Sequence, residues 1–105
     1  MDIFTDYSGI SIRLTDERLQ HITDSHPSVL EIPDAVAETL INPDVVRSSS
    51  RSTDTRLYYR WYTETKYNDK YVCVVVVVSQ DDAWIITAYL TEAVKQGELI
   101  WEREM

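Results

Sequence analysis

The stretch KYVCVVVVVSQDDAWIITAYL, Lys70 to Leu90, decides the fold of this chain. Its two apolar segments flank Gln80-Asp81-Asp82, and polar turn residues between two apolar runs predict an antiparallel hairpin. The first segment, Tyr71 to Val78, is apolar throughout, which is typical of a central strand that is covered on both faces. We therefore expect a sheet whose core is built around this hairpin.

The second segment of the hairpin, Ala83 to Leu90, carries two hydroxyl groups. Side chains alternate across a strand, so one face is expected to hold Ala83, Ile85, Thr87 and Tyr89. Polar groups on a core strand are destabilising unless they are hydrogen-bonded or line a cleft. Thr87 and Tyr89 are therefore the first candidates for a functional site.

Two helices are expected before the hairpin. The first begins after Thr15, a good N-cap residue, and ends near His26, because the following proline disfavours a helical conformation there. The second is expected from Pro33 to Ile41, with Pro33 at its first position and Asn42-Pro43-Asp44 as its stop.

Further strands are expected on either side of these helices. Apolar and polar side chains alternate from Ile10 to Leu14. In the stretch from Arg56 to Tyr62, Leu57, Tyr59 and Trp61 alternate with the arginines and the other tyrosines. This period of two indicates strands. Val45-Val46 is expected to begin another strand. The polar stretch from Ser48 to Asp54 is expected to be a loop or a weak edge strand.

The end of the chain is expected to form a short helix and a tail. Thr91 would cap the helix, Gly97 would end it after Gln96, and Glu98 to Trp101 is a last extended segment. The order of these elements predicts an α+β fold, in which two N-terminal helices pack on a four-stranded antiparallel sheet.

The length of 105 residues is enough for one hydrophobic core, so residues 1–105 are expected to form a single domain. Cys73 is the only cysteine and lies inside the valine run, where we expect a buried, unreactive thiol. No apolar stretch is long enough for a signal peptide or a membrane span. These features predict a soluble cytoplasmic protein with no membrane partner.

The net charge of −8 argues against a generic nucleic-acid binder, because attraction to phosphate dominates such binding. The charge is unevenly distributed, since residues 45–75 carry six positive and three negative side chains. One face could therefore be basic while the molecule as a whole is acidic. The alternative is that these charges are simply solvated on exposed strand faces.

Two histidines, His21 and His26, lie on the first predicted helix, about 140 degrees apart around its axis. Neither a HExxH pattern nor a set of cysteines is present, so no metal site and no cofactor are predicted. Histidine is nevertheless suited to proton transfer near neutral pH. The alternatives are that His26 belongs to the core or the helix end and that His21 is simply exposed.

Arg56, Tyr58 and Arg60 share one face of a predicted strand. If the register brought that face against Thr87 and Tyr89, the site could cleave a phosphodiester without metal through the 2′-hydroxyl group. Histidine would move the proton, arginine would stabilise the charge on phosphorus, and the hydroxyls would position the phosphate. The alternative is that Arg60 pairs with a surface carboxylate and that the tyrosines only pack.

Six segments occur in an informative order: RLTDERLQHITDSHP, INPDVV, LYYRWY, the valine run, ITAYLT and KQGELIW. Together they resemble the phage-encoded nuclease family that is grouped with the barnase, EndoU, colicin and RelE-like ribonucleases, the BECR fold. The resemblance extends from about Ile10 to Trp101. It implies two N-terminal helices on a four-stranded antiparallel sheet and a metal-independent ribonuclease site on that sheet.

The resemblance also implies which residues act. The helix signature HI…HP would supply His21 and His26, and the TAY motif would supply Thr87 and Tyr89. Arg60 would match the strand arginine of the family, and Lys95 the basic residue of its final KxGE segment. The expected catalytic set is therefore His21, His26, Arg60, Thr87 and Tyr89, with substrate binding by Arg56, Tyr58 and Lys95.

The function expected from these features is a toxin-like or phage-derived ribonuclease, with RNA as substrate and a cognate inhibitor protein as partner. The competing class is a catalytically silent protein-binding domain, such as a homodimer that pairs an exposed strand edge or an aromatic surface. The two classes differ in whether a histidine, Arg60 and Thr87 or Tyr89 converge in one cleft.

Overall fold

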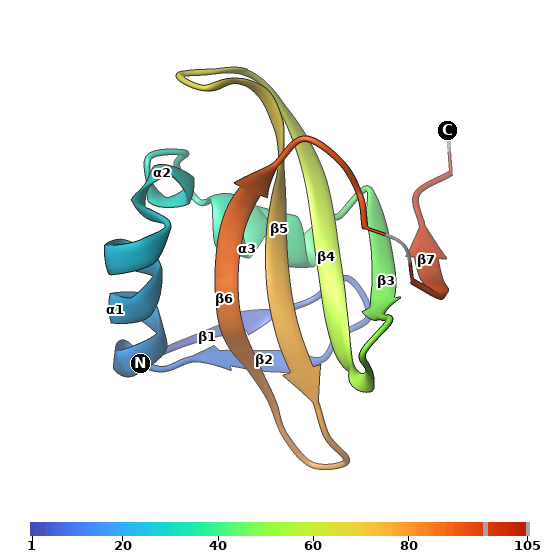
Figure 1. Ribbon diagram of the computed structural model, residues 1–105. Helices are drawn as coiled ribbons and strands as arrows, with labels where there is room; N and C mark the ends of the chain where they lie inside the picture. The colour runs from blue at the N-terminus through green and yellow to red at the C-terminus, as the bar shows by residue number, and fades with distance from the viewer. Residues whose placement is uncertain (96, 105) are drawn as a thin grey trace.

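The computed structural model describes residues 1–95 and 97–104, with all their side chains except that of Glu64. Within these residues the chain forms one sheet of seven strands and three short helices (Figure 1). The strands are β1 (Asp2–Thr5), β2 (Ser11–Leu14), β3 (Val45–Ser49), β4 (Ser52–Thr65), β5 (Asn68–Val78), β6 (Ala83–Thr91) and β7 (Leu99–Glu102). The helices are α1 (Asp16–Ser25), α2 (Pro27–Leu30) and α3 (Ala35–Ile41).

The expected sheet of four antiparallel strands is wrong. The strands lie in the order β1-β2-β6-β5-β4-β3-β7, and the sheet is mixed because β2 runs parallel to β6, with Arg13 opposite Trp84. The strands at its two edges, β1 and β7, are four residues long and mostly exposed. A strand without a buried stripe leaves little trace in the hydrophobic pattern, and this is why β1 was not predicted.

The first helix was predicted correctly. The Thr15 hydroxyl accepts a hydrogen bond of 3.2 Å from the Arg18 amide and so caps the N-terminus of α1. The helix ends at Ser25, and the next proline, Pro27, begins the separate single-turn helix α2. The interruption at His26 turns the chain between the two helices.

The other helix predictions need correction. The predicted helix from Pro33 begins only at Ala35, because Asp34 adopts a left-handed backbone conformation with φ of 56°. The short helix expected after Thr91 does not form, since Glu92–Lys95 has no helical turn. Its last expected residue, Gln96, lies outside the described residues.

The polar stretch from Ser48 to Asp54 is mostly strand rather than loop. Strand β3 extends to Ser49 and β4 begins at Ser52, so only Ser50 and Arg51 form the turn between them. A register shift at Ser48/Ser49 accommodates this tight connection. Backbone hydrogen bonding between the two strands overrides the weak β-propensity of the serines and the aspartate.

The sheet has two different faces. Helix α3 packs behind β4 and β5 in Figure 1, over the larger hydrophobic core, and we call this side the helix face. The β6–β7 connection crosses in front of β5 and β4, and we call this side the loop face. The loop face holds a smaller cluster of buried residues, namely Val45, Leu57, Tyr59 and Cys73.

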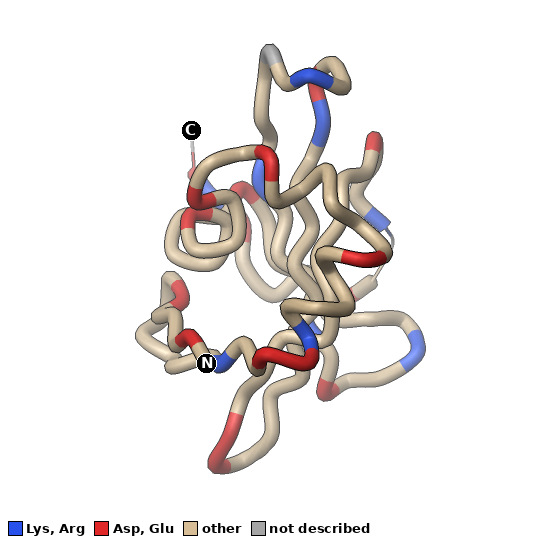
Figure 2. The backbone as a smooth tube through the Cα atoms, turned by 90° about the vertical axis from the view of Figure 1, so that its left-hand side faces the viewer, with Lys and Arg blue, Asp and Glu red and all other residues tan. Residues whose placement is uncertain are grey.

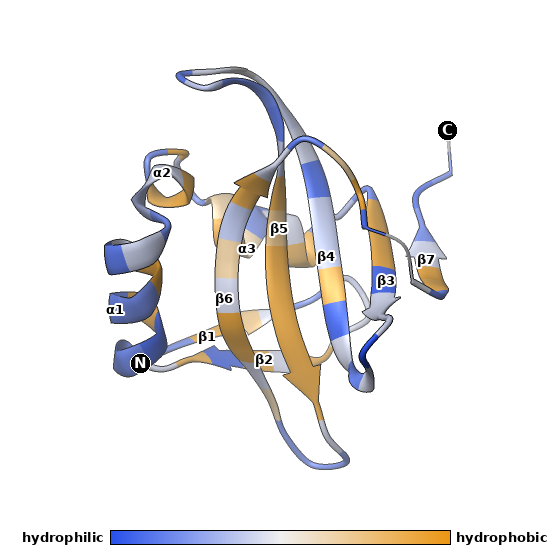
Figure 3. Cartoon of the chain, in the orientation of Figure 1, coloured by the Kyte–Doolittle hydropathy of each residue, from blue (hydrophilic) through white to orange (hydrophobic). Residues whose placement is uncertain are grey.

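Strand β5 lies at the centre of both cores. Its side chains alternate between them, with Val72 and Val74 on the helix face and Cys73 on the loop face. Figure 3 shows β5 as the most continuously apolar strand of the sheet. The expected central strand and its buried cysteine are therefore confirmed. No helix in the described part of the chain is long and apolar enough to cross a membrane.

An irregularity in β6 changes which residues share a face. Val75 lies opposite Thr87, but the next residue, Val76, lies opposite Ile85, so β6 contains one extra residue, Ile86. Ile85 consequently packs in the helix-face core while Thr87 points to the loop face with Tyr89. The expectation that Ile85 shares a face with Thr87 is wrong, whereas the pairing of Thr87 with Tyr89 is confirmed.

Candidate active site

Helix α1 lies beside the β6 edge of the sheet, where β2 has diverged from β6 (Figure 1). From this position the His21 side chain reaches the loop face. Its Nε2 atom lies 3.2 Å from the hydroxyl oxygen of Thr87, and both side chains are half-buried. The helix, which is fixed by its Thr15 cap, and the β6 bulge thus bring together groups 66 residues apart in the sequence.

The second histidine extends this site along β6. His26 sits between α1 and α2, and its ring centroid lies 5.7 Å from that of Tyr89 and 6.0 Å from that of His21. The break before Pro27 allows this, because a continuous helix would have turned His26 about 140 degrees away from His21. Two imidazoles, a threonine hydroxyl and a tyrosine therefore line one side of the loop face.

Lys95 borders the site from the β6–β7 connection. Its Nζ atom lies 5.4 Å from the ring centroid of Tyr89, within the range of a cation–π interaction. The backbone amide of Lys95 donates a hydrogen bond of 3.1 Å to the hydroxyl of buried Tyr59. This bond holds the connection close to the sheet, so Lys95 stays near Tyr89.

The same connection is fastened to β3. Arg47 Nη1 donates a hydrogen bond of 2.9 Å to the carbonyl of Gly97, and the Ser48 amide donates one of 2.8 Å to the carbonyl of Glu98. A Cβ atom at Gly97 would collide with the carbonyl oxygen of Ser48. Glycine is therefore required for this close approach of two backbone segments.

Two buried titratable groups, Cys73 and Tyr59, lie below the site, and a third, Tyr89, belongs to it. Burial raises the pKa of the Cys73 thiol to about 11 and that of the Tyr59 hydroxyl to about 12. Burial, together with neighbouring Cys73, also raises the pKa of Tyr89 above its ordinary value. All three groups therefore stay protonated at neutral pH, and the hydroxyl of Tyr89 can act as a hydrogen-bond donor.

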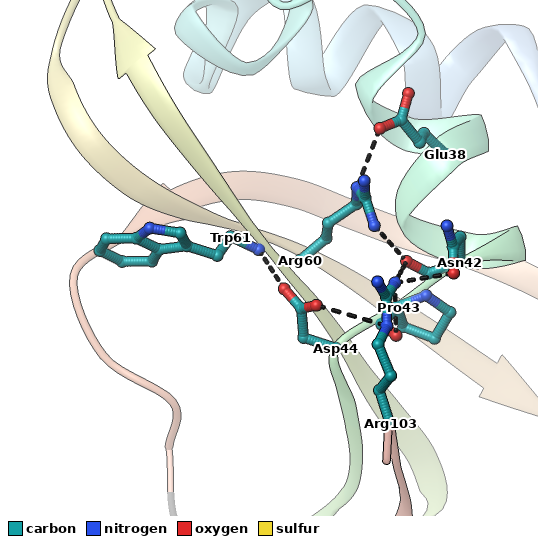
Figure 4. Close-up of polar contacts among 7 residues, drawn as sticks. All are labelled: Glu38, Asn42, Pro43, Asp44, Arg60, Trp61 and Arg103. Carbon is teal, nitrogen blue, oxygen red and sulfur yellow. Dashed lines mark hydrogen bonds and ion pairs between the residues drawn. The ribbon is translucent and has the colours of Figure 1, made fainter. Parts of the chain in front are cut away.

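Arg60 does not join this site. It lies opposite Val72 in the β-ladder and points to the helix face, where its Nε atom donates a hydrogen bond of 2.9 Å to Glu38 in α3. Its Nη1 atom donates another of 2.8 Å to the backbone carbonyl of Asn42 (Figure 4). The register thus separates Arg60 from Thr87 and Tyr89 by the thickness of the sheet.

The two other candidates on β4 also point to the helix face. Tyr58 is fully buried, and its hydroxyl donates a hydrogen bond of 2.6 Å to the carboxylate of Asp6. Burial raises the pKa of this tyrosine, and the positive charge of Arg56, on the same strand, lowers it by a smaller amount. Of the eight residues expected to act, the structure brings together His21, His26, Thr87, Tyr89 and Lys95, and it places Arg56, Tyr58 and Arg60 on the opposite face.

Sequence reasoning missed several residues near the site. Tyr59 and Arg47 hold the β6–β7 connection, and Arg51 lies close to Tyr89 and Lys95 around one pocket. Strand alternation alone could have placed Tyr59 on the other face of the sheet from Tyr58. Arg51 had no such signal, because its stretch was expected to be a loop or a weak edge strand. No three His, Cys, Asp or Glu side chains cluster as a metal-binding group among the described residues.

The surroundings of the site differ in charge from the rest of the protein. The chain has 18 acidic and 10 basic residues, and Figure 2 shows the acidic ones spread along the whole backbone. Among the described residues, Lys95 forms no ion pair with a carboxylate. The site therefore has a cation beside Tyr89 with no carboxylate partner in the described part of the chain, although the molecule is strongly acidic.

Comparison with known proteins gives one match. The model of a protein family described as phage-Barnase-EndoU-ColicinE5/D-RelE like nuclease2 (PBECR2) matches residues 1–104. No match was found among curated proteins or among solved structures. The match covers nearly the whole chain and confirms the resemblance seen in its motifs. The chain therefore belongs to this family of phage nucleases.

Proposed function

We propose that this protein is an endoribonuclease that cleaves RNA without a metal ion, by attack of the 2′-hydroxyl on the adjacent phosphorus. Membership of a nuclease family supports a nucleic acid as the substrate, and RNA is part of this proposal. The observation that carries the proposal is the gathering of His21, His26, Thr87, Tyr89 and Lys95 on one face of the sheet. The competing idea of a silent binding domain has no comparable support.

The two histidines would carry the protons. One imidazole takes the proton of the 2′-hydroxyl while the 2′-oxygen forms a bond to phosphorus. The bond from phosphorus to the 5′-oxygen then breaks, and the other imidazole, protonated, gives its proton to that oxygen. The products are a 2′,3′-cyclic phosphate and a free 5′-hydroxyl. The ring centroids of the two histidines lie 6.0 Å apart, so both imidazoles are close enough to contact one phosphodiester group.

The remaining groups would position the phosphate and stabilise its charge. Thr87 contacts His21 Nε2 and so orients that ring. Tyr89, which stays protonated, can donate a hydrogen bond to a non-bridging phosphate oxygen, and Lys95 beside it supplies positive charge. Lys95 takes the role first expected for Arg60, whose guanidinium lies on the other face of the sheet.

The proposal is tested by the chemistry of the products. Purified protein is incubated with a labelled RNA oligonucleotide in excess EDTA, and the product ends are identified by mass spectrometry. We expect cyclic phosphate ends, and no cleavage of the same sequence made with 2′-O-methyl sugars. The double variant His21→Ala/His26→Ala, purified in parallel, controls for contaminating ribonuclease and should be inactive. A requirement for added metal, 5′-phosphate products or cleavage of the 2′-O-methyl oligonucleotide would contradict the proposal.

A further inference from the structure

A pocket lies on the loop face next to the proposed catalytic residues, between the β3–β4 turn and Tyr89. We infer that this pocket binds one unstacked nucleotide of single-stranded RNA, adjacent to the phosphate that is cleaved. The inference rests on the proposed function and extends it from the reacting groups to the binding of substrate. We call it the turn pocket; it is lined by Ser49, Arg51, Thr55, Leu57, Val75 and Tyr89, together with Lys95.

The turn pocket has a size and a lining that suit a nucleotide. Its volume is about 530 Å³, within the range of small-molecule sites. Buried Leu57 and half-buried Val75 lie side by side in the sheet and form the apolar floor of the pocket, where a nucleobase can contact mainly Val75. The hydroxyl groups of Ser49 and Thr55 can form hydrogen bonds with the edge of such a base.

The distribution of unpaired basic residues is the strongest argument for a phosphate ligand. Six of the ten Lys and Arg side chains form ion pairs with carboxylates: Arg13, Arg18, Arg60, Lys66, Lys70 and Arg103. Four form none with the described residues, and three of these, Arg47, Arg51 and Lys95, lie at the β3 side of the loop face.

Two of these unpaired side chains, Arg51 and Lys95, line the turn pocket itself. No carboxylate lines it among the described residues. In a protein of net charge −8, two cations without acidic partners among the described residues, around one pocket with an apolar floor, are complementary to a nucleotide, which combines a phosphate and a nucleobase.

The position of the turn pocket connects it with the catalytic groups. Tyr89 both lines the pocket and packs against His26. Thr87 lies opposite Val75, and Val75 lies opposite Leu57, so the three side chains form a row across β6, β5 and β4. Neighbouring strands are about 4.8 Å apart, and the row therefore spans roughly 10 Å. A nucleotide in the pocket and a phosphate at His21 can thus belong to one short stretch of RNA.

The lining distinguishes single-stranded from double-stranded RNA. A nucleobase can reach the pocket floor formed by Val75 and Leu57 only if it is unpaired and unstacked from its neighbours. An RNA duplex would present only its phosphates and sugars, so the apolar floor of the pocket would make no contact with a nucleobase. Single-stranded RNA is therefore the ligand that uses the whole lining.

The experiment uses a probe that cannot be cleaved. Single-stranded hexanucleotides of A, C, G and U with 2′-O-methyl sugars are titrated into the wild-type protein, and methyl signals are followed by NMR. We expect at least one hexanucleotide to shift the methyl signals of Leu57 and Val75, and the matching duplex not to do so. Unchanged Leu57 and Val75 signals at saturation, no binding of any hexanucleotide, or equal shifts with the duplex would overturn the inference.

Arg51→Ala tests the role of charge in the turn pocket. Arg51 is exposed, so its removal should not disturb the fold. We expect affinity for the hexanucleotide to fall roughly tenfold, and the slope of log affinity against log salt to decrease by about 0.7, as for one lost contact with a single strand. Arg18→Ala, which removes the same charge from α1, is the matched control and should change neither value. Equal weakening by both variants would overturn the inference.

A kinetic measurement separates this inference from the proposed function. If the wild-type protein cleaves RNA, Arg51→Ala should raise KM roughly tenfold with little change in kcat, because Arg51 has no role in the proposed reaction and contributes only to substrate binding. An unchanged KM would overturn the inference and leave the ribonuclease function intact. If the wild-type protein does not cleave RNA, the proposed function fails, and the hexanucleotide titrations still decide whether the turn pocket binds a nucleotide.

Discussion

The two faces of the sheet use polar side chains in different ways. On the helix face, Arg60 is bonded to Glu38 and Asn42, and the hydroxyl of Tyr58 is bonded to Asp6. On the loop face, His21 has a threonine hydroxyl as its hydrogen-bond partner and a neighbouring histidine ring beside it, and Lys95 forms no ion pair with the described residues. Polar groups whose partners come from the chain itself stabilise the fold, whereas groups with unused bonding capacity are available to a ligand.

The polar network around Arg60 illustrates the first kind. The carbonyl oxygen of Asn42 accepts hydrogen bonds from Arg60 and from Arg103, and Arg103 also bonds to the Asn42 side chain (Figure 4). The carboxylate of Asp44 accepts a hydrogen bond from the Trp61 amide. The network therefore connects the end of α3 to β4 and to the segment after β7, and it leaves Arg60 little capacity for a substrate.

The largest effect is expected from the loop face. His21→Ala removes one of the two groups proposed to move protons, so kcat/KM for RNA cleavage should fall about 1000-fold, or about 4 kcal/mol of transition-state stabilisation. Gln20→Ala, the exposed neighbour on the same helix, is the matched control and should retain full activity. Comparable activity of His21→Ala and Gln20→Ala would remove His21 from the site.

The helix face should show the next largest effect, on stability alone. Asp6 is 1% exposed and accepts hydrogen bonds from Ser8, Ile10 and Tyr58. Asp6→Ala leaves the buried Tyr58 hydroxyl without its acceptor and should lower the free energy of unfolding by about 3 kcal/mol. Urea unfolding measures this loss.

The exposed Asp24→Ala gives the baseline for this measurement, and we expect it to cost less than about 0.5 kcal/mol. At a temperature where Asp6→Ala is still folded, its kcat should equal that of the wild type. A loss of kcat beyond about tenfold in the folded variant would show that the helix face contributes to the chemistry.

Alkaline pH should produce a smaller loss of stability through the groups below the site. The pKa of Cys73 is raised from 9.0 to about 11 in the folded protein. Between these values the unfolded chain loses the thiol proton while the folded protein keeps it, so stability decreases as pH rises. The free energy of unfolding should therefore fall by about 1 kcal/mol between pH 9 and pH 10 through Cys73.

Cys73→Ala serves as the control for this pH dependence. It should make the decrease between pH 9 and pH 10 smaller by about 1 kcal/mol. It should leave the decrease that comes from the buried tyrosines Tyr58, Tyr59 and Tyr89, whose pKa values are also raised by burial. The measurement is urea unfolding at pH 8, 9, 10 and 11. An identical decrease between pH 9 and pH 10 in both proteins would show that the thiol is not responsible.

Local sequence patterns predicted the parts of the fold that depend on neighbouring residues. The period of side chains and the Thr15 cap predicted α1, and the alternating and continuous apolar runs predicted β4, β5 and β6. The short strands β1 and β7 carry no buried stripe. β7 is held in place by backbone pairing with the distant strand β3, which periodicity does not report, and it was predicted only as an extended segment.

The candidate site was predicted in part for the same reason. Thr87 and Tyr89 are close in sequence, and their common face followed from strand alternation alone. Whether Arg60 shares that face depends on the pairing of β4 with β5 and of β5 with β6. A shift of one residue in either pairing would move Arg60 to the other face relative to Thr87. Packing across the whole sheet sets both pairings and the extra residue Ile86 in β6, so sequence alone could not decide the face of Arg60.

The most direct test of this account compares two variants that each remove one positive charge, Lys95→Gln on the loop face and Arg60→Gln on the helix face. We expect Lys95→Gln to lower kcat/KM for RNA roughly tenfold, through lost stabilisation of phosphate charge. Arg60→Gln should leave kcat/KM within about twofold of the wild type and lower the free energy of unfolding by about 1 kcal/mol. A folded Arg60→Gln protein with a greatly reduced kcat/KM, beside an unaffected Lys95→Gln protein, would contradict the assignment of the site to the loop face.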